Sequence, residues 1–216
     1  MELRDLEKLI RGRRSVRQWK EQNVPEDLLK KAVELATWAP NGGNYQGWRF
    51  IIVKNRKVIV KMADTVQTTA NKIASWPESA GLKDEMERYR ANASFFRNAP
   101  VCIGVFANQY MGVMDKALIA REGFDPEARE IMAYRRSAPT AIQSAAASVT
   151  TLLLALHQMG LGAVWLGAPL MAKKEIETIL KVSRDLSLVC LVAVGYPDEF
   201  PHKDRKPVDQ VLEFLP

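Results

Sequence analysis

PTAIQSAAASVTTLLLALHQM, residues 139–159, is small or apolar around nearly its whole helical circumference. A helix of that composition is usually central and buried, here in the core or against a partner subunit. GAVWLG, residues 162–167, follows almost directly and has the apolar content of a buried strand. A long buried helix followed by a buried strand predicts a sheet that is covered by helices.

Three further apolar runs complete the predicted sheet: WRFIIVK (48–54), VCIGVFA (101–107) and LVCLVAVG (188–195). Their aromatic and β-branched content is typical of strands, and near-continuous apolar runs indicate helices on both faces. Apolar residues at helical spacing predict helices at 3–12, 28–36, 58–67 and 172–182. Because we find no internal repeat and no linker, we predict one α+β domain over residues 1–216.

The composition is that of an average soluble protein, with 47% apolar and 26% charged residues among 216. These values exclude disordered, collagen-like and low-complexity chains. The formal charge of +6 is mild and admits several kinds of anionic partner. The N-terminus is charged from its second residue, and no stretch approaches the roughly 20 uncharged apolar residues of a membrane span. We therefore expect a cytoplasmic protein with no membrane partner.

The two cysteines and two histidines narrow the chemistry further. Cys102 and Cys190 each lie inside an apolar run, so we interpret both as core thiols rather than a disulfide pair. His157 lies in the long apolar helix and His202 in a polar loop, so no metal-ligand spacing exists. The positions of the two histidines give little support to metal catalysis or to a Ser-His-Asp triad, and we predict no metal site.

Residues 108–136, which we call the lid segment, differ from the predicted core. The segment has mixed charge, two glycines and weak periodicity. It also follows directly on a buried strand, where binding loops often lie. We therefore expect a mobile lid that influences substrate choice, although its aromatic and sulfur side chains could equally pack it onto the body.

Basic residues are concentrated near the N-terminus. Six of them fall between residues 8 and 20 with no acidic residue: Lys8, Arg11, Arg13, Arg14, Arg17 and Lys20. Such a run is usually a solvated face. It can also be a phosphate cradle, because guanidinium forks match phosphate oxygens and Ser15 adds a hydroxyl. A second basic cluster, HKDRK at 202–206, follows the GYP turn at 195–197.

Four stretches together resemble one family, the FMN-dependent nitroreductase-like flavoproteins. RRSVRQW (13–19) resembles the family's opening Arg-Arg/His-Ser-x-Arg/Lys motif, and APNGGNYQGWRFIIV (39–53) resembles its Pro-Ser-x-x-Asn-x-Gln-Pro-Trp loop and following strand. GLGAVWLGAP (160–169) is similar to the strand that passes the flavin, and GYP with KDRKP is similar to the phosphate-binding end. The chain departs from the pattern where Gly47 replaces Pro and where Gly42 and Gly43 replace hydroxyl residues.

The resemblance implies a nitroreductase-like fold, with a central, mostly antiparallel sheet covered by helices on both faces. It also implies a homodimer that holds FMN at the subunit interface. The residues that it assigns to the FMN phosphate are Arg13, Ser15, Lys203 and Arg205. By the same resemblance, Arg14 matches a position along the ribityl chain and ring edge, and Arg17 matches a basic residue at the pyrimidine edge. A cation at that edge would stabilise the charge that develops during hydride transfer.

The resemblance also assigns residues to the two faces of the flavin ring. Those implied to come from the second subunit are Pro40, Asn41, Gly42 and Asn44. Those implied to pass the other face are Trp165, Leu166, Gly167 and Ala168, with the Gly167 backbone N–H near N5. Arg17 and Gly167 are thus the implied catalytic residues. Read alone, Gly162 and Gly167 could simply begin and end a strand.

Three functions remain open at this point. The first is an FMN-dependent enzyme that is reduced by NADH or NADPH and then reduces nitroaromatics, quinones or enones in a ping-pong sequence. The second is another flavin chemistry on this fold, either reductive dehalogenation, for which Glu85 and Tyr89 have a suggestive spacing, or flavin fragmentation. The third is a basic nucleic-acid-binding module, which the scarcity of aromatics in the RGRRSVR run disfavours.

Overall fold

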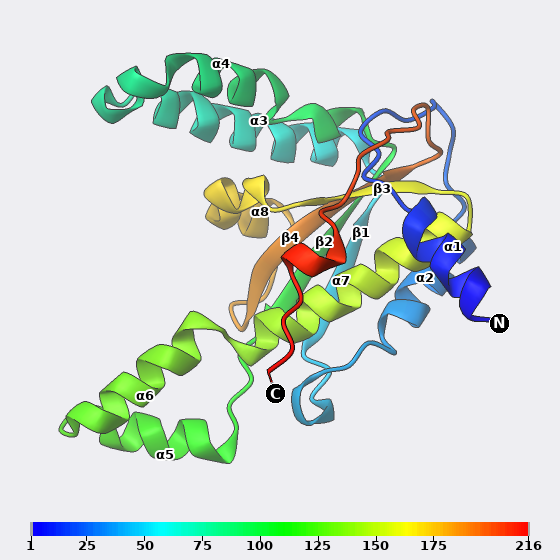
Figure 1. Cartoon of the computed structure of the whole chain (residues 1–216). Helices are drawn as coiled ribbons and strands as arrows, with labels where there is room; N and C mark the ends of the chain where they lie inside the picture. The colour runs from blue at the N-terminus through cyan, green and yellow to red at the C-terminus, as the bar shows by residue number, and fades with distance from the viewer. Residues whose placement is uncertain (1, 216) are drawn as a thin grey trace.

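A four-stranded antiparallel sheet forms the centre of the molecule in a computed structural model that describes residues 2–215. The strands are β1 (Trp48–Val53), β2 (Val101–Asn108), β3 (Gly162–Leu166) and β4 (Leu186–Gly195), in the spatial order β1-β2-β4-β3. Every neighbouring pair is antiparallel, and Ile103 of β2 lies between Ile52 of β1 and Val192 of β4. The four predicted strands and the predicted α+β architecture are therefore confirmed (Figure 1).

One face of the sheet is covered by α2 (Glu26–Ala36) and α7 (Thr140–Gln158), which pack against each other. Leu29 of α2 and Leu152 and Leu156 of α7 are fully buried against Val105 and other strand residues. Gly160, with φ of +76°, ends α7 in the left-handed conformation that glycine adopts at least cost. The long apolar stretch is thus the central helix that its composition predicts.

The opposite face is covered by α3 (Arg56–Ala74), α8 (Lys173–Ile179) and the short 3-10 helices η3 (Phe95–Asn98) and η4 (Ala168–Ala172). Fully buried Ile59, Met62, Phe96 and Ile176 form this second core with strand residues such as Leu191. Alternate residues of β2 and β4 enter different cores, which explains why both strands are almost continuously apolar.

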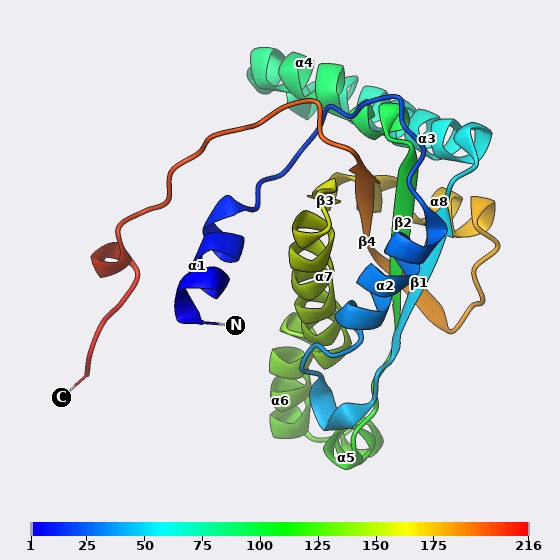
Figure 2. The same cartoon turned by 90° about the vertical axis from the view of Figure 1, so that its right-hand side faces the viewer.

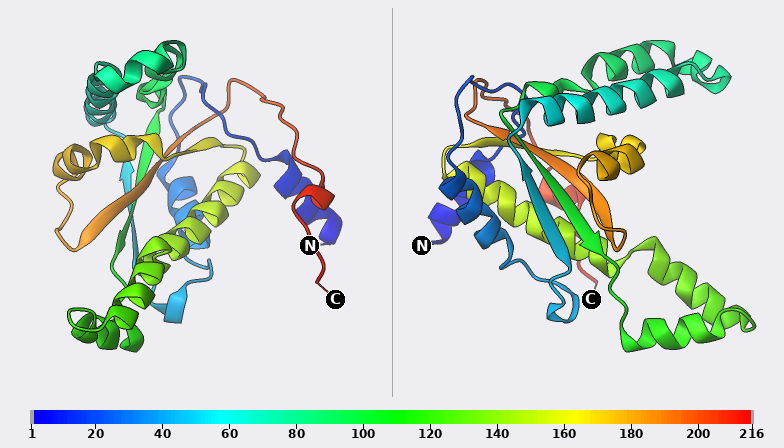
Figure 3. Two further views of the ribbon diagram at one scale, coloured as in Figure 1. Left: turned by 60° about the vertical axis from the view of Figure 1, so that its left-hand side comes forward. Right: turned by 180° about the vertical axis from the view of Figure 1, so that it is seen from behind.

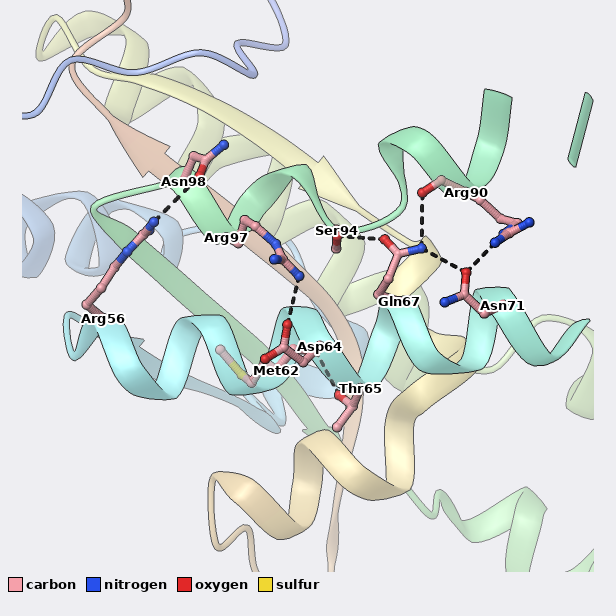
Figure 4. Close-up of polar contacts among 10 residues, drawn as sticks. All are labelled: Arg56, Met62, Asp64, Thr65, Gln67, Asn71, Arg90, Ser94, Arg97 and Asn98. Carbon is pink, nitrogen blue, oxygen red and sulfur yellow. Dashed lines mark hydrogen bonds and ion pairs between the residues drawn. The ribbon is translucent and has the colours of Figure 1, made fainter. Parts of the chain in front are cut away.

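The helix α4 (Lys83–Asn92), which follows the 3-10 helix η2 (Pro77–Leu82), packs back on α3. Polar contacts hold this hairpin and η3 together: Gln67 bonds to Ser94 (2.8 Å), Arg90 bonds to Asn71 (2.9 Å), and Arg97 pairs with Asp64 (2.8 Å) (Figure 4). None of the ten described residues of α4 is buried. The sequence therefore carries no apolar periodicity that would predict this helix.

The lid segment forms a second pair of helices, α5 (Val113–Arg121) and α6 (Pro126–Ser137), at the end of the molecule opposite α3 and α4 (Figures 1 and 3). Arg136 pairs with Glu122 at 2.7 Å, and Arg135 pairs with Asp115. The Arg135 hydrogen bond holds the pKa of Asp115 below its usual value. The segment shows weak periodicity because few of its side chains, Met132 among them, are buried.

The chain ends lie apart from the sheet on the same side (Figure 2). None of the ten described residues of α1 (Leu3–Gly12) is buried, although α1 touches α7. Beyond β4 the chain is extended except for the 3-10 helix η5 (Val208–Gln210). Phe214 and Leu215 are each 86% exposed and Leu3 is 80% exposed, so both ends present uncovered apolar side chains.

The prediction that no stretch approaches the apolar length of a membrane span is wrong. Among residues 2–215, the helical stretch Pro126–Gln158 is long and apolar enough to cross a membrane, by length and composition alone. Its second part is α7, where Val149 and Leu152 are fully buried against the sheet. A central core helix meets the same criterion as a membrane span because both are apolar on every side.

The two cysteines are free and buried, as predicted. Burial and the neighbouring Cys190 raise the pKa of the Cys102 thiol to about 12, and burial raises the pKa of Cys190 to about 12. A thiol of that pKa is almost entirely protonated at neutral pH and is a poor nucleophile. Both cysteines therefore contribute packing rather than chemistry.

Candidate functional site

Residues 13–19 lie along the free edge of β3. The Val16 N–H donates to the Ala163 carbonyl (3.1 Å), and the Trp19 indole N–H donates to the Gly162 carbonyl (3.0 Å). Further along, Lys20 N–H donates to the Tyr196 carbonyl (3.0 Å), where the chain leaves β4. These bonds fix the basic segment between β3 and the C-terminal segment.

Arginines gather at this edge, and Glu199, a carboxylate beside them, forms no ion pair with their guanidinium groups. Burial first, then the positive charges of Arg205 and Arg14, lower the pKa of Arg13 below its usual value. Within residues 2–215, no ion pair involves Arg13, Arg14 or Arg205, and the buried Arg14 Nε has no hydrogen-bond partner. Cations that repel one another and keep unused donors are suited to bind an anion with several oxygens.

A cavity of about 330 Å³ opens beside Arg13 and Arg14. Arg13, Arg14, His157, Glu199 and the backbone around Gly162 are among the groups that line it. Burial, Arg13 and Arg14 together lower the pKa of His157. Sequence reasoning assigned His157 no role, because its neighbours in α7 are apolar and only the fold brings it beside the arginines.

Arg17 and Lys203 lie near this edge with little to hold their side chains. Arg17 is exposed, and its guanidinium donates to the Ser15 carbonyl at 3.1 Å. Its backbone N–H donates to Glu199. Lys203 lies in the exposed C-terminal segment, two residues from Arg205. Both cations are thus free to turn toward a ligand.

The far end of β3 has an open backbone at Gly167. Leu166 points into the core, whereas Trp165 and Gly167 are exposed and Ala168 begins η4. A methyl group added at Gly167 would meet no atom within 4 Å. The main chain is therefore accessible here, and a ligand could approach the Gly167 N–H closely.

Residues 40–47 form a tight loop at the other end of α7. The Gly42 N–H donates to the Ser144 hydroxyl (3.2 Å), and the Asn41 side chain accepts from the Gln46 N–H (2.9 Å). Pro40 and Asn44 are exposed, and Gly43, Asn44 and Gln46 have φ between +52° and +61°. The 3-10 helix η1 (Gly42–Asn44) lies within this loop.

Side chains of the lid segment and of α7 lie close to the three unusual glycines of this loop. A methyl group at Gly43 would lie 2.8 Å from the Tyr110 hydroxyl, and one at Gly42 would lie 2.3 Å from Thr140 Cγ2. At Gly47 it would lie 2.3 Å from Asn108 Oδ1. The Tyr110 ring also packs against Tyr45, with centroids 5.1 Å apart. A larger residue at these positions would therefore have to displace Tyr110 or Asn108 of the lid segment, or Thr140 of α7.

The structure does not bring all the predicted residues together in one protomer. It places Arg13, Arg14, Ser15, Arg17 and Arg205 around the C-terminal end of α7 and the edge of β3. Pro40, Asn41, Gly42 and Asn44 lie at the N-terminal end of α7. Ser144 and His157 mark these two ends and are about 20 Å apart along the helix axis.

The arginine cluster and the exposed backbone at Gly167 can bind an anion beside an accessible main chain. Among residues 2–215, no group of three or more His, Cys, Asp or Glu side chains is placed to hold a metal ion. The fixed cations and the exposed Gly167 backbone can bind and orient a ligand, but they supply no activated nucleophile. Any oxidation or reduction here would need a cofactor.

Comparison with known proteins gives matches to one family and to solved flavoprotein structures. Residues 10–196 match the model of the Nitroreductase family. The crystal structure of a BluB-like flavoprotein from Clostridium difficile 630 is 27% identical, covers all of both chains and superposes with a TM-score of 0.84. An iodotyrosine deiodinase bound to FMN and 3-iodo-L-tyrosine is 26% identical, covers 94% of this chain and 95% of its own, and gives a TM-score of 0.70.

A curated relative from Methanothermobacter thermautotrophicus carries the name NADH dehydrogenase/NAD(P)H nitroreductase. It is 27% identical over 199 residues, which covers 91% of this chain and 80% of the relative.

Proposed function

This chain belongs to the Nitroreductase family and is an oxidoreductase of that family, and on that premise we propose that it binds FMN and passes hydride from NADH or NADPH to a small conjugated acceptor. Nitroaromatics, quinones and enones are the acceptor classes that we propose. The observation that carries the proposal is the unneutralised cluster of Arg13, Arg14 and Arg205 beside the β3 edge.

The cluster fits the phosphate of FMN. A phosphate monoester offers three acceptor oxygens and close to two negative charges. It would relieve the mutual repulsion that lowers the pKa of Arg13 and would give the buried Arg14 Nε an acceptor. Ser15 and Lys203 would add a hydroxyl and a further cation. Arg14 would extend toward the ribityl chain.

The chain's own residues bind and orient rather than react. FMN, when bound, supplies the hydride chemistry. The Gly167 N–H would face the reacting edge of the ring, and the open space above it admits a flat ligand. Arg17 would turn its guanidinium toward the pyrimidine edge and stabilise negative charge as it develops. Trp165, Leu166 and Ala168 would contribute main chain along the same face.

We propose that the site is completed by a second copy of the chain. Pro40, Asn41, Gly42 and Asn44 lie at the opposite end of α7 from the arginines, so they can cover a flavin only in a partner protomer. The apolar side chains of α1 and of the C-terminal segment support this, because burial against a partner would remove them from water. A folded monomer carrying FMN in sedimentation at micromolar concentration would contradict the dimer.

The lid segment would then act on the partner's site. Tyr110 packs against the loop of residues 40–47, so the lid and that loop lie at the same end of the protomer. Phe124 is 72% exposed, with the Arg121 guanidinium 5.7 Å from its ring centroid, and remains available to an acceptor. We propose that this segment selects the acceptor rather than binding FMN.

Reductive dehalogenation is a second candidate, favoured by the 26% identity to an iodotyrosine deiodinase over 94% of this chain. Glu85 and Tyr89 lie on α4, and both side chains are exposed. Incubation of the reduced protein with a halophenol separates the candidates, since halide release identifies dehalogenation. Loss of the flavin absorbance on exposure to oxygen would instead identify flavin fragmentation.

The test of the main proposal begins with the absorbance spectrum of the purified protein. A flavin band, and release of FMN on denaturation, are expected. Anaerobic mixing with NADH or NADPH should bleach the band, and a quinone or nitroaromatic should restore it. A colourless protein that takes up no FMN would overturn the proposal, and a shift of DNA at low salt would then favour the nucleic-acid reading.

A further inference from the structure

His157 lines the same cavity as Arg14 and as Arg13, which is assigned above to the FMN phosphate. A methyl group at Gly12 would lie 3.0 Å from His157 Nε2, so the ring is held against the chain just before Arg13. Among residues 2–215, no side-chain hydrogen bond engages the imidazole. His157 is therefore a half-buried, unpartnered donor at the edge of the cationic cluster.

Among the described residues, the charged groups that line the cavity beside this ring are two arginines and one glutamate. Arg13 and Arg14 approach it from the segment after α1, and Glu199 lines the same cavity from the C-terminal segment. His157 is the one titratable residue within α7 itself, and β3 contributes only Gly162 and Ala163 to the cavity. The surroundings are thus dominated by two cations.

We propose that His157 is an additional phosphate-binding residue for FMN, and that it binds the phosphate most strongly when the imidazole carries a proton. The inference rests on the proposed function, because it requires FMN at this cluster. A dianionic phosphate beside the ring would offset the charges of Arg13 and Arg14. The carbonyl end of α7 would also stabilise an imidazolium in the last turn of the helix.

The direction of the pH dependence follows from linkage. Without FMN, burial and the two arginines hold the pKa of His157 below its ordinary 6.5. The folded protein then binds this proton less readily than the unfolded chain, so acidification through that range lowers its stability. Phosphate raises the pKa of His157 again, and FMN binding takes up a proton. His157 therefore strengthens FMN binding as the pH falls.

The test is the ratio of FMN dissociation constants for His157→Gln and the parent, measured by quenching of flavin fluorescence from pH 8.5 to pH 6. The titration of the phosphate in free FMN cancels in this ratio, because both proteins bind the same ligand. We expect a ratio near one at pH 8.5 that rises to about tenfold at pH 6, as for the loss of one charge-assisted hydrogen bond. Riboflavin, which lacks the phosphate, should give a ratio that does not change with pH.

His202→Gln is the matched control, because His202 is the second of the two histidines and is exposed. The ratio of its FMN dissociation constant to that of the parent should not change with pH. A pH-independent ratio for His157→Gln, with tight FMN binding by the parent, would overturn the role of His157 and leave the proposed function standing. Failure of the parent to bind FMN would overturn the proposed function itself.

A second measurement does not depend on the folding of His157→Gln. In His202→Gln the one remaining imidazole signal in a proton NMR spectrum belongs to His157. Its titration should give a pKa below 6.5 without FMN and a higher value with FMN bound. The same pKa in both states would contradict the proposal.

Discussion

The two ends of α7 carry two very different halves of the candidate site. At the C-terminal end, Arg13, Arg14 and His157 line a cavity, and among the described residues the buried Arg14 Nε has no hydrogen-bond partner. At the N-terminal end, Gly42 and Gly43 have no side chain because Thr140 and Tyr110 fill the space. The charge of an arginine can be read from the sequence alone. The reason for a glycine depends on its backbone conformation and on the residues packed around it, which only the structure shows.

This difference predicts that the two ends fail in different ways. Substitutions at the cationic end should change FMN binding and reduction and leave folding intact. Substitutions at the glycine end should change stability and acceptor choice first. The following variants test that division, from the largest expected effect to the smallest.

Arg13→Ala and Arg205→Ala should each weaken FMN binding by about one to two decades in dissociation constant. Each removes a charge-assisted contact worth ~1.5–3 kcal/mol. Fluorescence titration with FMN measures the change, and Arg184→Ala, an exposed arginine in the turn before β4, is the control. If both variants fold and hold FMN as tightly as the parent, the phosphate site is assigned wrongly.

Arg17→Ala, at the same end of the molecule, should lower the rate of flavin reduction more than it lowers the affinity for FMN. The charge that Arg17 opposes develops during hydride transfer, so we expect the rate of flavin reduction to fall by about tenfold and FMN affinity to change less. Stopped-flow reduction by NADH or NADPH provides the rate. An unchanged rate would remove Arg17 from the mechanism.

Gly43→Ala should destabilise the fold by about 1 kcal/mol, because alanine tolerates φ of +61° poorly. Its methyl group would also lie 2.8 Å from the Tyr110 hydroxyl, so Tyr110→Phe should recover part of the loss. Urea unfolding of the two single variants and the double variant measures the coupling. Additive losses would show that the lid segment does not constrain this loop.

Gly81→Ala is the control for that experiment, because a methyl group there meets no atom within 4 Å. It should leave the free energy of unfolding almost unchanged.

Phe124→Ala should have the smallest effect, a change of about threefold in the ratio of kcat/KM values for a quinone and a nitroaromatic. Exposed Phe124 makes few contacts within the protomer, so FMN content and stability should stay the same. Hydrogen exchange should also show residues 108–136 opening faster than β2. If residues 108–136 are as well protected from hydrogen exchange as β2, or if the ratio of kcat/KM values is unchanged, the segment is not a lid that selects the acceptor.

Much of the fold follows from local sequence because strands and helices with buried faces carry a periodic pattern. The four strands, α2, α7 and the N-terminal part of α3 are of this kind. The helices α4 and α5 bury one side chain or none, so their sequences contain little periodicity. Their positions depend on contacts such as Arg90 to Asn71 and Asp115 to Arg135, which join residues far apart in the chain.

The sequence by itself determined the β-sheet core, the apolar central helix and the basic residues suited to bind a phosphate. These are properties of residue type and spacing. Only the tertiary structure placed His157 beside Arg13 and Arg14, and only it showed that Tyr110 and Thr140 lie close to Gly43 and Gly42. It also put the residues near 40–44 and the arginines at opposite ends of α7. Such relations are distances between remote parts of the chain, and no local pattern of residues encodes them.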